Sequence, residues 1–162
     1  MTIAPIPFLG GFSQVAYITT DIDRAVALFG ERYGVARFAI TREVPFDPAT
    51  RMDMALAYSG TTMLEIIAAR GNGGSLYEIG MPATGFALQF HHFGHVVESI
   101  ADWNRLRERV AAGWLPIAIA REDPAGDFPF MYLDARAELG HFIEYSLLTP
   151  ARRAMYASIP RN

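Results

Sequence analysis

The sequence lacks cysteine, which excludes disulfide bonds, thiolate metal sites and cysteine nucleophiles. It lacks any apolar run near the roughly 20 residues that a membrane-spanning helix needs. Its start lacks the charged region and long apolar stretch of a signal peptide. Its charges are mixed, with 14 basic and 17 acidic residues, and form no basic stripe for nucleic acid. We therefore expect a soluble, cytoplasmic protein whose partner is neither nucleic acid nor a membrane.

What the sequence does have is an internal repeat, in a chain of 162 residues of which 51% are hydrophobic. At a shift of 78 residues, 14–22 aligns with 92–100. After one extra residue the shift becomes 79, and 64–65 aligns with 143–144. Chance rarely keeps one offset over so many positions. The chain is therefore predicted to contain two copies of one module, and its length suffices for both.

Each copy has the same predicted order of elements, β-α-β-β-β. Residues 12–19 and 90–97 have the apolar, β-branched and aromatic content of strands. Asp21 and Ser99 are typical N-cap residues before helical patterns, and Gly34 and Gly113 suit the left-handed residue that ends a helix. The remaining predicted strands are 36–43, 52–58 and 62–68 in the first copy, and 115–121, 129–134 and 141–148 in the second.

The repeat also predicts the domain organisation and an α+β fold. We expect the sheets of the two βαβββ modules to curl into an open, roughly eight-stranded barrel with a central cup. The linker is rich in turn-forming residues and lacks the Lys-Ser/Thr of a phosphate loop. The expected parts are an N-terminal extension (1–11), the first module (12–70), the linker (71–87), the second module (88–148) and a C-terminal tail (149–162).

Four polar residues occupy equivalent positions in the two copies and interrupt otherwise apolar strands. Gln14 corresponds to His92 on the first strands, and Glu65 corresponds to Glu144 on the last strands. Taken singly, Gln14 would more often be an ordinary hydrogen-bonded strand residue, and each glutamate a sheet-edge charge. Glutamate is almost never buried without a partner, however, and all four side chains can coordinate a cation. Together they predict one metal site facing the cup.

The other histidines and two arginines have simpler interpretations. Residues of a strand alternate between faces, so His91 and His95 point away from the ligand candidate between them and are interpreted as structural. His141 is interpreted as a rim residue. Arg42 and Arg121 are equivalent in the repeat and would either grip a substrate carboxylate or be ordinary strand-edge charges.

Five short motifs carry a resemblance to a known family: Gln14-Val-Ala-Tyr, Asp21-Ile-Asp-Arg-Ala-Val, Leu64-Glu65, His92-Phe-Gly-His and Gly140-His-Phe-Ile-Glu144. Over nearly 12–148, the pattern resembles the vicinal oxygen chelate (glyoxalase/bleomycin resistance/dioxygenase) superfamily. The resemblance implies metal ligands on the first and fourth strand of each module, here Gln14, Glu65, His92 and Glu144. The set resembles that of some glyoxalase I enzymes. Methylmalonyl-CoA epimerases are similar, but usually have His where Gln14 stands and Gln where Glu65 stands, and extradiol dioxygenases use two His and one Glu.

The donor set indicates the metal and the chemistry. Two carboxylates, one amide and one imidazole would neutralise a divalent ion and suit roughly octahedral Zn²⁺, Ni²⁺, Co²⁺ or Mn²⁺ with two open positions. A substrate with two adjacent oxygens would fit there and react through a metal-stabilised enolate. A carboxylate must then take and return the proton, and Glu144 is the first candidate for this base.

Asp53 is the second candidate for the base. It lies in the third predicted strand, where epimerase-like relatives similarly carry an acidic residue, and its copy in the second module is Tyr132. The turn around Ser59-Gly60 decides which way Asp53 points. A two-residue turn would pair Glu65 with Met54 and send Asp53 the other way, whereas a turn longer by one residue would bring it into the cup. The alternative is an ordinary surface aspartate.

Three functions remain open. The leading hypothesis is a metal-dependent lyase, isomerase or epimerase, and the runner-up within that class is a lactoylglutathione lyase. The alternative of another class is a metal-free binding protein of the bleomycin-resistance type, which the complete ligand set disfavours. We expect a homodimer, with modules paired within one chain or swapped between two. Core packing explains most of the aromatic residues that could line the cup of such a binding protein, which are Phe38, Phe86, Phe128, Phe130 and Tyr132.

Overall fold

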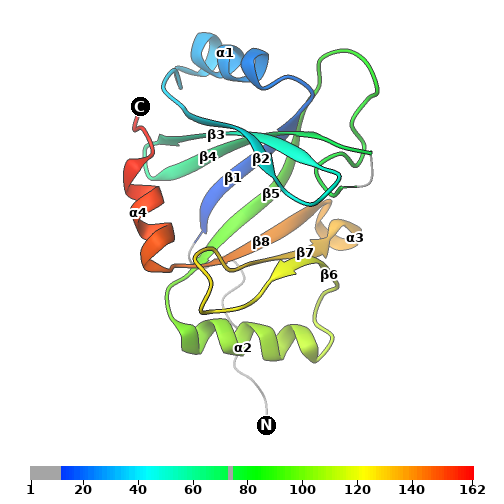
Figure 1. Ribbon diagram of the computed structural model, residues 1–162, viewed down its shortest axis with the longest axis vertical. Coiled ribbons are helices and arrows are strands. Elements are labelled where there is room, and N and C mark those ends of the chain that lie inside the picture. The colour runs from blue at the N-terminus through cyan, green and yellow to red at the C-terminus, as the bar shows by residue number, and fades with distance from the viewer. Residues whose placement is uncertain (1–11, 73–74) are drawn as a thin grey trace. The chain divides into compact units, whose positions relative to one another are not determined.

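The computed structural model describes residues 12–72 and 75–162. The expected N-terminal extension (1–11) and residues 73–74 of the expected linker lie outside the described residues. Along the described chain, eight strands and four helices form an α+β arrangement, which confirms the predicted fold class (Figure 1). The chain forms two compact units, Gln14–His91 with Ile159–Asn162, and His92–Ser158 with the start of the first strand.

The first module has the predicted βαβββ order. Its sheet has the order β2-β3-β4-β1, in which β1 is parallel to β4 and the other pairs are antiparallel. The side chain of Asp21 caps the helix by accepting a hydrogen bond from the backbone N–H of Arg24, and Gly34 follows the helix with a φ of 72°. Both were predicted. The elements are β1 (Phe12–Thr19), α1 (Ile22–Tyr33), β2 (Ala39–Pro45), β3 (Arg51–Ser59) and β4 (Thr62–Arg70).

The second module repeats this order. Its strands lie in the order β5-β8-β7-β6, with β5 parallel to β8 and the other pairs antiparallel. Ser99 caps α2 through the backbone N–H of Asp102, and Gly113 has a φ of 87°, as predicted. Two further helices are α3 (Arg136–Leu139), which was not predicted, and α4 (Pro150–Ser158) in the tail. The elements are β5 (Leu88–Val97), α2 (Ile100–Ala111), β6 (Ile117–Arg121), β7 (Phe130–Ala135) and β8 (His141–Leu147).

The strands do not close into a barrel. β2 and β6 stand at the two ends of the strand order, and each pairs with a single neighbour among the described strands. The sheet therefore stays open, as expected. No helix within the described ranges has the length and apolar content that a membrane span requires.

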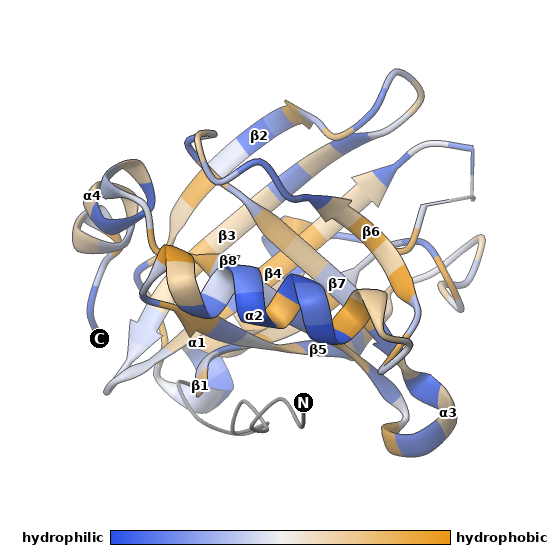
Figure 2. Cartoon of the chain, turned by 90° about the horizontal axis from the view of Figure 1, so that it is seen from below, coloured by the Kyte–Doolittle hydropathy of each residue, from blue (hydrophilic) through white to orange (hydrophobic). Residues whose placement is uncertain are grey.

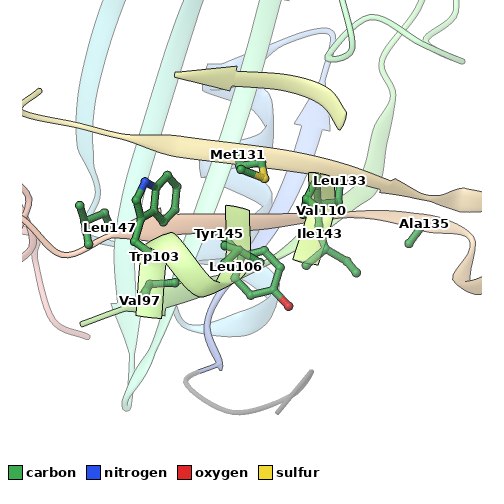
Figure 3. Close-up of a cluster of buried hydrophobic side chains, with 10 residues drawn as sticks. All are labelled: Val97, Trp103, Leu106, Val110, Met131, Leu133, Ala135, Ile143, Tyr145 and Leu147. Carbon is green, nitrogen blue, oxygen red and sulfur yellow. The ribbon is translucent and has the colours of Figure 1, made fainter. Parts of the chain in front are cut away.

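Helices α1 and α2 each pack on one face of their own module's sheet. The strand residues that face α1 or α2 are apolar and buried. The outward face of α2 is mostly hydrophilic (Figure 2). The side chain of Trp103 projects from α2 toward the sheet and is fully buried. Burying a side chain of this size contributes about 2–3 kcal/mol to the free energy of unfolding. The core under α2 consists of Val97, Trp103, Leu106, Val110, Met131, Leu133, Ala135, Ile143, Tyr145 and Leu147 (Figure 3).

Candidate functional site

The first candidate half-site consists of Gln14 on β1 and Glu65 on β4, which are neighbouring parallel strands. Leu64 and Ile66 pack in the core cluster beneath α1, so Glu65 between them points to the opposite face of the sheet. Gln14 is 4% exposed, and its Nε2 donates a hydrogen bond to Glu65 Oε2. The fold of the first module thus brings two of the four predicted ligands into contact.

The second candidate half-site consists of His92 on β5 and Glu144 on β8, again on neighbouring parallel strands. Ile143 and Tyr145 face α2, so Glu144 points to the face that the helix leaves free. His92 is fully buried and Glu144 is 8% exposed. His92 Nε2 lies 3.3 Å from Glu144 Oε2. The other two predicted ligands are therefore also in contact with each other.

Two further side chains support the second half-site. Ser146 Oγ donates a hydrogen bond of 2.9 Å to Glu144 Oε1. The hydroxyl of Tyr132 lies 3.4 Å from His92 Nε2, and the two rings meet edge to face. Both were missed as polar partners by the sequence analysis, which counted Tyr132 only as an aromatic residue. The available signal was strand alternation, because Ser146 follows Glu144 by two residues on the same face.

The environment of Glu144 favours its charged form. Burial raises the pKa of this carboxyl, but the hydrogen bond and positive charge of His92 act against burial. The charge of Arg152 and the hydrogen bond from Ser146 also lower the pKa, and the net shift is below the ordinary value of a glutamate. Glu144 is therefore an anion at neutral pH, as a metal ligand or a base must be.

The donor chemistry of both half-sites fits a divalent cation. Each half-site sets one buried or half-buried carboxylate beside one amide or imidazole side chain. Charged groups in such surroundings need a compensating partner. The Gln14 amide now turns its nitrogen toward Glu65, and a half-turn of that amide would present its oxygen to a cation instead. Carboxylate, amide and imidazole are the donors that Zn²⁺, Ni²⁺, Co²⁺ and Mn²⁺ accept.

Asp53 lies on the other face of the first module's sheet. The turn after Ser59 has two residues, and the resulting register pairs Glu65 with Leu56, not with Met54 as expected, and Asp53 with Ala68. Residues paired in this way share a face, so Asp53 is turned away from Glu65. As a catalytic base it is therefore poorly placed, and the register is the physical reason.

The environment of Asp53 is that of a structural ion-pair cluster. Arg70 donates to both of its carboxylate oxygens, Arg42 donates to Oδ2 and the backbone N–H of Glu43 donates to Oδ1. The hydrogen bond from Arg70 lowers the pKa of Asp53, burial opposes it, and the N–H of Glu43 adds to the lowering. Arg42 also binds Asp23. Arg42 is therefore engaged with aspartates, which disfavours the hypothesis that it grips a substrate carboxylate.

The remaining histidines lie where strand alternation predicts. His91 is buried, with Nε2 3.1 Å from the carbonyl oxygen of Leu76. His95 is buried and stacks on Tyr145, on the side of the sheet that α2 covers. His141 is half-buried and meets the ring of Phe93 edge to face.

Two of the predicted cup-lining aromatic residues lie elsewhere. Phe38 and Phe86 pack against the core beneath α1, on the opposite face from Glu65. Phe130, in contrast, is in ring contact with Tyr132 and shares its face of β7. Phe38 and Phe86 thus follow the core-packing interpretation, and they complete the helix-side core of the first module.

Arg152 was also missed by the sequence analysis, which assigned the C-terminal tail to neither module. It lies in the first turn of α4 and is 7% exposed. Its guanidinium donates to the carbonyl oxygens of Leu147 and Pro129, both at 3.1 Å. No sequence signal distinguishes it from the neighbouring Arg153, which is exposed.

The comparisons with known proteins agree with this architecture. The sequence pattern of the Glyoxalase/Bleomycin resistance protein/Dioxygenase superfamily matches residues 13–132. The chain therefore belongs to this superfamily, which confirms the resemblance drawn from its motifs. No curated protein is similar enough in sequence to count as a match.

Solved structures share the fold at low sequence identity. Methylmalonyl-CoA epimerase from Mycobacterium tuberculosis superposes with a TM-score of 0.59 at 16% identity, covering 89% of this chain and 91% of the epimerase. A hypothetical protein from Bacillus halodurans C-125 gives a TM-score of 0.62 at 15% identity, covering 85% and 94%. A variant Streptomyces coelicolor methylmalonyl-CoA epimerase in complex with 2-nitronate-propionyl-CoA gives 0.57 at 14% identity, covering 86% and 94%.

Proposed function

We propose that this protein is a metal-dependent isomerase or epimerase that removes and returns a proton next to a carbonyl group of a small substrate with two neighbouring oxygens. The observation that carries the proposal is the pair of equivalent half-sites, Gln14 with Glu65 and His92 with Glu144. Epimerases among the proteins of similar fold support the reaction class. The broader class also includes lyases that work through the same enolate.

The proposed metal site unites both half-sites around one Zn²⁺, Ni²⁺, Co²⁺ or Mn²⁺ ion. Gln14, Glu65, His92 and Glu144 supply one amide, two carboxylates and one imidazole. The half-sites meet either within one chain or between the two chains of a homodimer. A divalent ion bound there supplies Lewis-acid polarisation of the substrate carbonyl.

Glu144 is the proposed base. Its carboxylate accepts the proton from the carbon beside the carbonyl, and the electron pair of the C–H bond forms the carbon–carbon double bond of an enolate. The hydrogen bond from Ser146 favours the ionised form of Glu144 and fixes its orientation. A proton delivered by water to the opposite face of the same carbon gives epimerisation. Where that carbon carries a hydroxyl, moving the hydroxyl proton to the enolate oxygen and returning the carbon-bound proton to the former carbonyl carbon gives isomerisation. Asp53 has no part in this proposal.

The metal site is tested by composition and affinity. Protein purified without chelator should contain one divalent ion for each set of four ligands, or take one up on titration with Zn²⁺, Ni²⁺, Co²⁺ or Mn²⁺. Glu65→Gln in one half-site and Glu144→Gln in the other should each weaken uptake. Glu31→Gln, an exposed change of the same chemistry on α1, is the matched control. Absence of metal after both purification and titration would contradict the proposal.

The chemistry is tested without knowing the natural substrate. In D₂O, the enzyme should exchange the hydrogen at the 2-position of a 2-substituted malonyl thioester for deuterium, as followed by proton NMR. Glu144→Gln should abolish the exchange. A metal-loaded protein that exchanges no hydrogen in any such compound would argue against proton abstraction.

A lactoylglutathione lyase is the second candidate. The Gln14–Glu65 pair favours it, because methylmalonyl-CoA epimerases usually carry His and Gln at these two positions. The hemithioacetal of methylglyoxal and glutathione tests it directly. Turnover of this compound with any of the four metals would support lactoylglutathione lyase activity. The absence of turnover with all four metals would exclude it.

Metal-free sequestration of an aromatic compound is the third candidate. It draws support from Phe130 and Tyr132, which share a face with Glu144. Tight binding in a chelator, without turnover, would favour it over an enzyme. We also propose a homodimer, which analytical ultracentrifugation would test.

A further inference from the structure

Arg152 is a buried cation in the first turn of α4, with an exposed fraction of 7%. Its backbone N–H donates to Thr149 Oγ1 just before the helix. Arginine is almost never fully buried unless it is paired, because removing its charge from water is costly without a compensating partner. The identity of its partners therefore indicates what the residue does.

The partners that Arg152 has are neutral. Nε donates to the carbonyl oxygen of Leu147 and Nη2 to that of Pro129, and the guanidinium lies 5.5 Å from the ring centroid of Phe128. In the described parts of the chain, 12–72 and 75–162, no carboxylate forms an ion pair with Arg152, and Nη1 makes no hydrogen bond. One nitrogen of the buried guanidinium is thus left without a hydrogen-bond acceptor among the described residues.

The position of this cation relates it to the proposed base. Arg152 binds the carbonyl of Leu147, the last residue of β8, and Glu144 and Ser146 project from the same strand. A strand advances about 3.3 Å per residue, so Leu147 lies roughly 10 Å beyond Glu144 along β8. The charge of Arg152 contributes to lowering the pKa of Glu144. The strand that carries the proposed base thus ends at the residue to which the cation is bound, roughly 10 Å of backbone away.

We propose that Arg152 binds the carboxylate of a small anionic substrate whose reacting carbon lies at Glu144. The inference rests on the proposed function, in which Glu144 removes the proton. It narrows the substrate class to compounds that carry a free carboxylate a few bonds from the two neighbouring oxygens. A guanidinium recognises a carboxylate through charge-assisted hydrogen bonds, and the positive end of α4 adds to the attraction.

The competing role for Arg152 is a clamp that only joins the ends of β7 and β8. A clamp would stabilise the fold but would not distinguish a charged ligand from an uncharged one of the same shape. Malonate and its neutral diamide, malonamide, are such a pair. Bound metal is first removed with a chelator, and the chelator is then removed. Calorimetry on this protein measures the affinity for each compound, and a preference for malonate separates the two roles.

The matched variants are Arg152→Met and Arg153→Met, which remove the same charge from adjacent positions of one helix. Arg153 is exposed, so its variant should bind malonate like the parent protein. Arg152→Met should weaken malonate binding at least tenfold and leave malonamide binding unchanged. Equal malonate binding by the parent and Arg152→Met, or a parallel loss of both ligands, would overturn the proposal.

Two further measurements keep the test decisive. If Arg152→Met does not fold, Arg152→Lys replaces it in the test. Lysine keeps the positive charge but lacks the planar guanidinium with its paired N–H donors, so this variant should bind malonate several-fold more weakly than the parent protein. A parent protein that binds malonate no better than malonamide overturns the proposal without any variant. Metal uptake and hydrogen exchange without malonate binding would refute only the role of Arg152. Malonate binding that depends on Arg152, without metal uptake, would refute the proposed function instead.

Discussion

The two modules have one order of elements but fill the space beneath their helices differently. At equivalent positions of the repeat, α1 carries Ala25 and α2 carries Trp103, and both are fully buried. Small side chains such as Ala55 and Ala57 dominate the core of the first module, whereas Leu106 and similar large residues fill the second. The side chains packed on the helix side thus differ between the two modules. On the other side of the sheet, both modules have a polar residue at each candidate ligand position.

The half-sites differ in a similar way. Gln14 and Glu65 contact each other on a face whose neighbouring residues, such as Met63, are apolar. Glu144 and its partner His92 are held by the hydroxyls of Ser146 and Tyr132 as well. Two hydroxyl groups thus lie at the half-site that carries the proposed base.

The largest expected effect tests the difference between the two cores. Trp103→Ala should lower the free energy of unfolding by about 3–5 kcal/mol, because it leaves a cavity at a fully buried position. Urea denaturation followed by circular dichroism measures the loss. Tyr33→Ala on α1, where the side chain is 66% exposed, is the control and should change stability by less than about 1 kcal/mol. Similar losses of unfolding free energy for Trp103→Ala and Tyr33→Ala would contradict the role of Trp103 in the core of the second module.

The second prediction compares the half-sites through metal affinity. Glu144→Gln removes a charged proposed ligand and should weaken metal binding by about 100-fold, or about 2.7 kcal/mol. Gln14→Ala removes a neutral ligand and should weaken it by about tenfold. Competition titrations with a metal-sensitive dye measure both affinities. A larger loss for Gln14→Ala would show that the first half-site dominates binding, and equal losses would contradict the predicted difference.

Sequence patterns predicted the elements better than the contacts. The repeat, the caps at Asp21 and Ser99 and the alternation of strand residues are local signals, and they were sufficient for the βαβββ order. The face of Asp53 was not predictable, because it depends on the length of one turn. Arg152 was not predictable either, because its burial depends on where α4 lies against Pro129 and Leu147, which no local pattern encodes.

The third prediction uses a position where the modules differ, Asp53 in the first and Tyr132 in the second. Asp53→Asn should lower the free energy of unfolding by about 2 kcal/mol at neutral pH, since charge-assisted hydrogen bonds from Arg70 and the N–H of Glu43 are weakened. Because Arg70 is about half-exposed, solvent screens part of the ion pair, and a larger loss is not expected.

The pH dependence of this loss follows from the sign of the shift. The pKa of Asp53 is lowered in the folded state, so its stabilisation is fully present above the unfolded pKa of about 3.9 and is lost as pH falls through the folded value. The difference in stability between the parent protein and Asp53→Asn should thus be constant from about pH 7 to 5 and shrink below about pH 4. Asp23→Asn, at a 71% exposed side chain, is the control. A difference that grows in acid would contradict the assigned ion pair.

The smallest expected effect is a gain in stability in the core of the second module. Tyr145 is 2% exposed, and its hydroxyl has no hydrogen-bond partner among the described residues. Burial raises the pKa of this phenol to about 12, although the charge of Arg109 acts in the opposite direction. Tyr145→Phe removes the unsatisfied hydroxyl and keeps the ring that stacks on His95, so the free energy of unfolding should rise by about 1 kcal/mol.

Tyr132→Phe sharpens this last comparison, because both changes remove one buried phenolic hydroxyl from neighbouring strands of the same sheet. The Tyr132 hydroxyl lies beside His92 on the candidate site face, whereas that of Tyr145 lies on the α2 face. Thermal denaturation should therefore show a midpoint about 2–4 °C higher for Tyr145→Phe and a lower or unchanged midpoint for Tyr132→Phe. A lower midpoint for Tyr145→Phe would mean that the Tyr145 hydroxyl forms a hydrogen bond in solution. The buried hydroxyls on the two faces of this sheet would then not differ in hydrogen bonding.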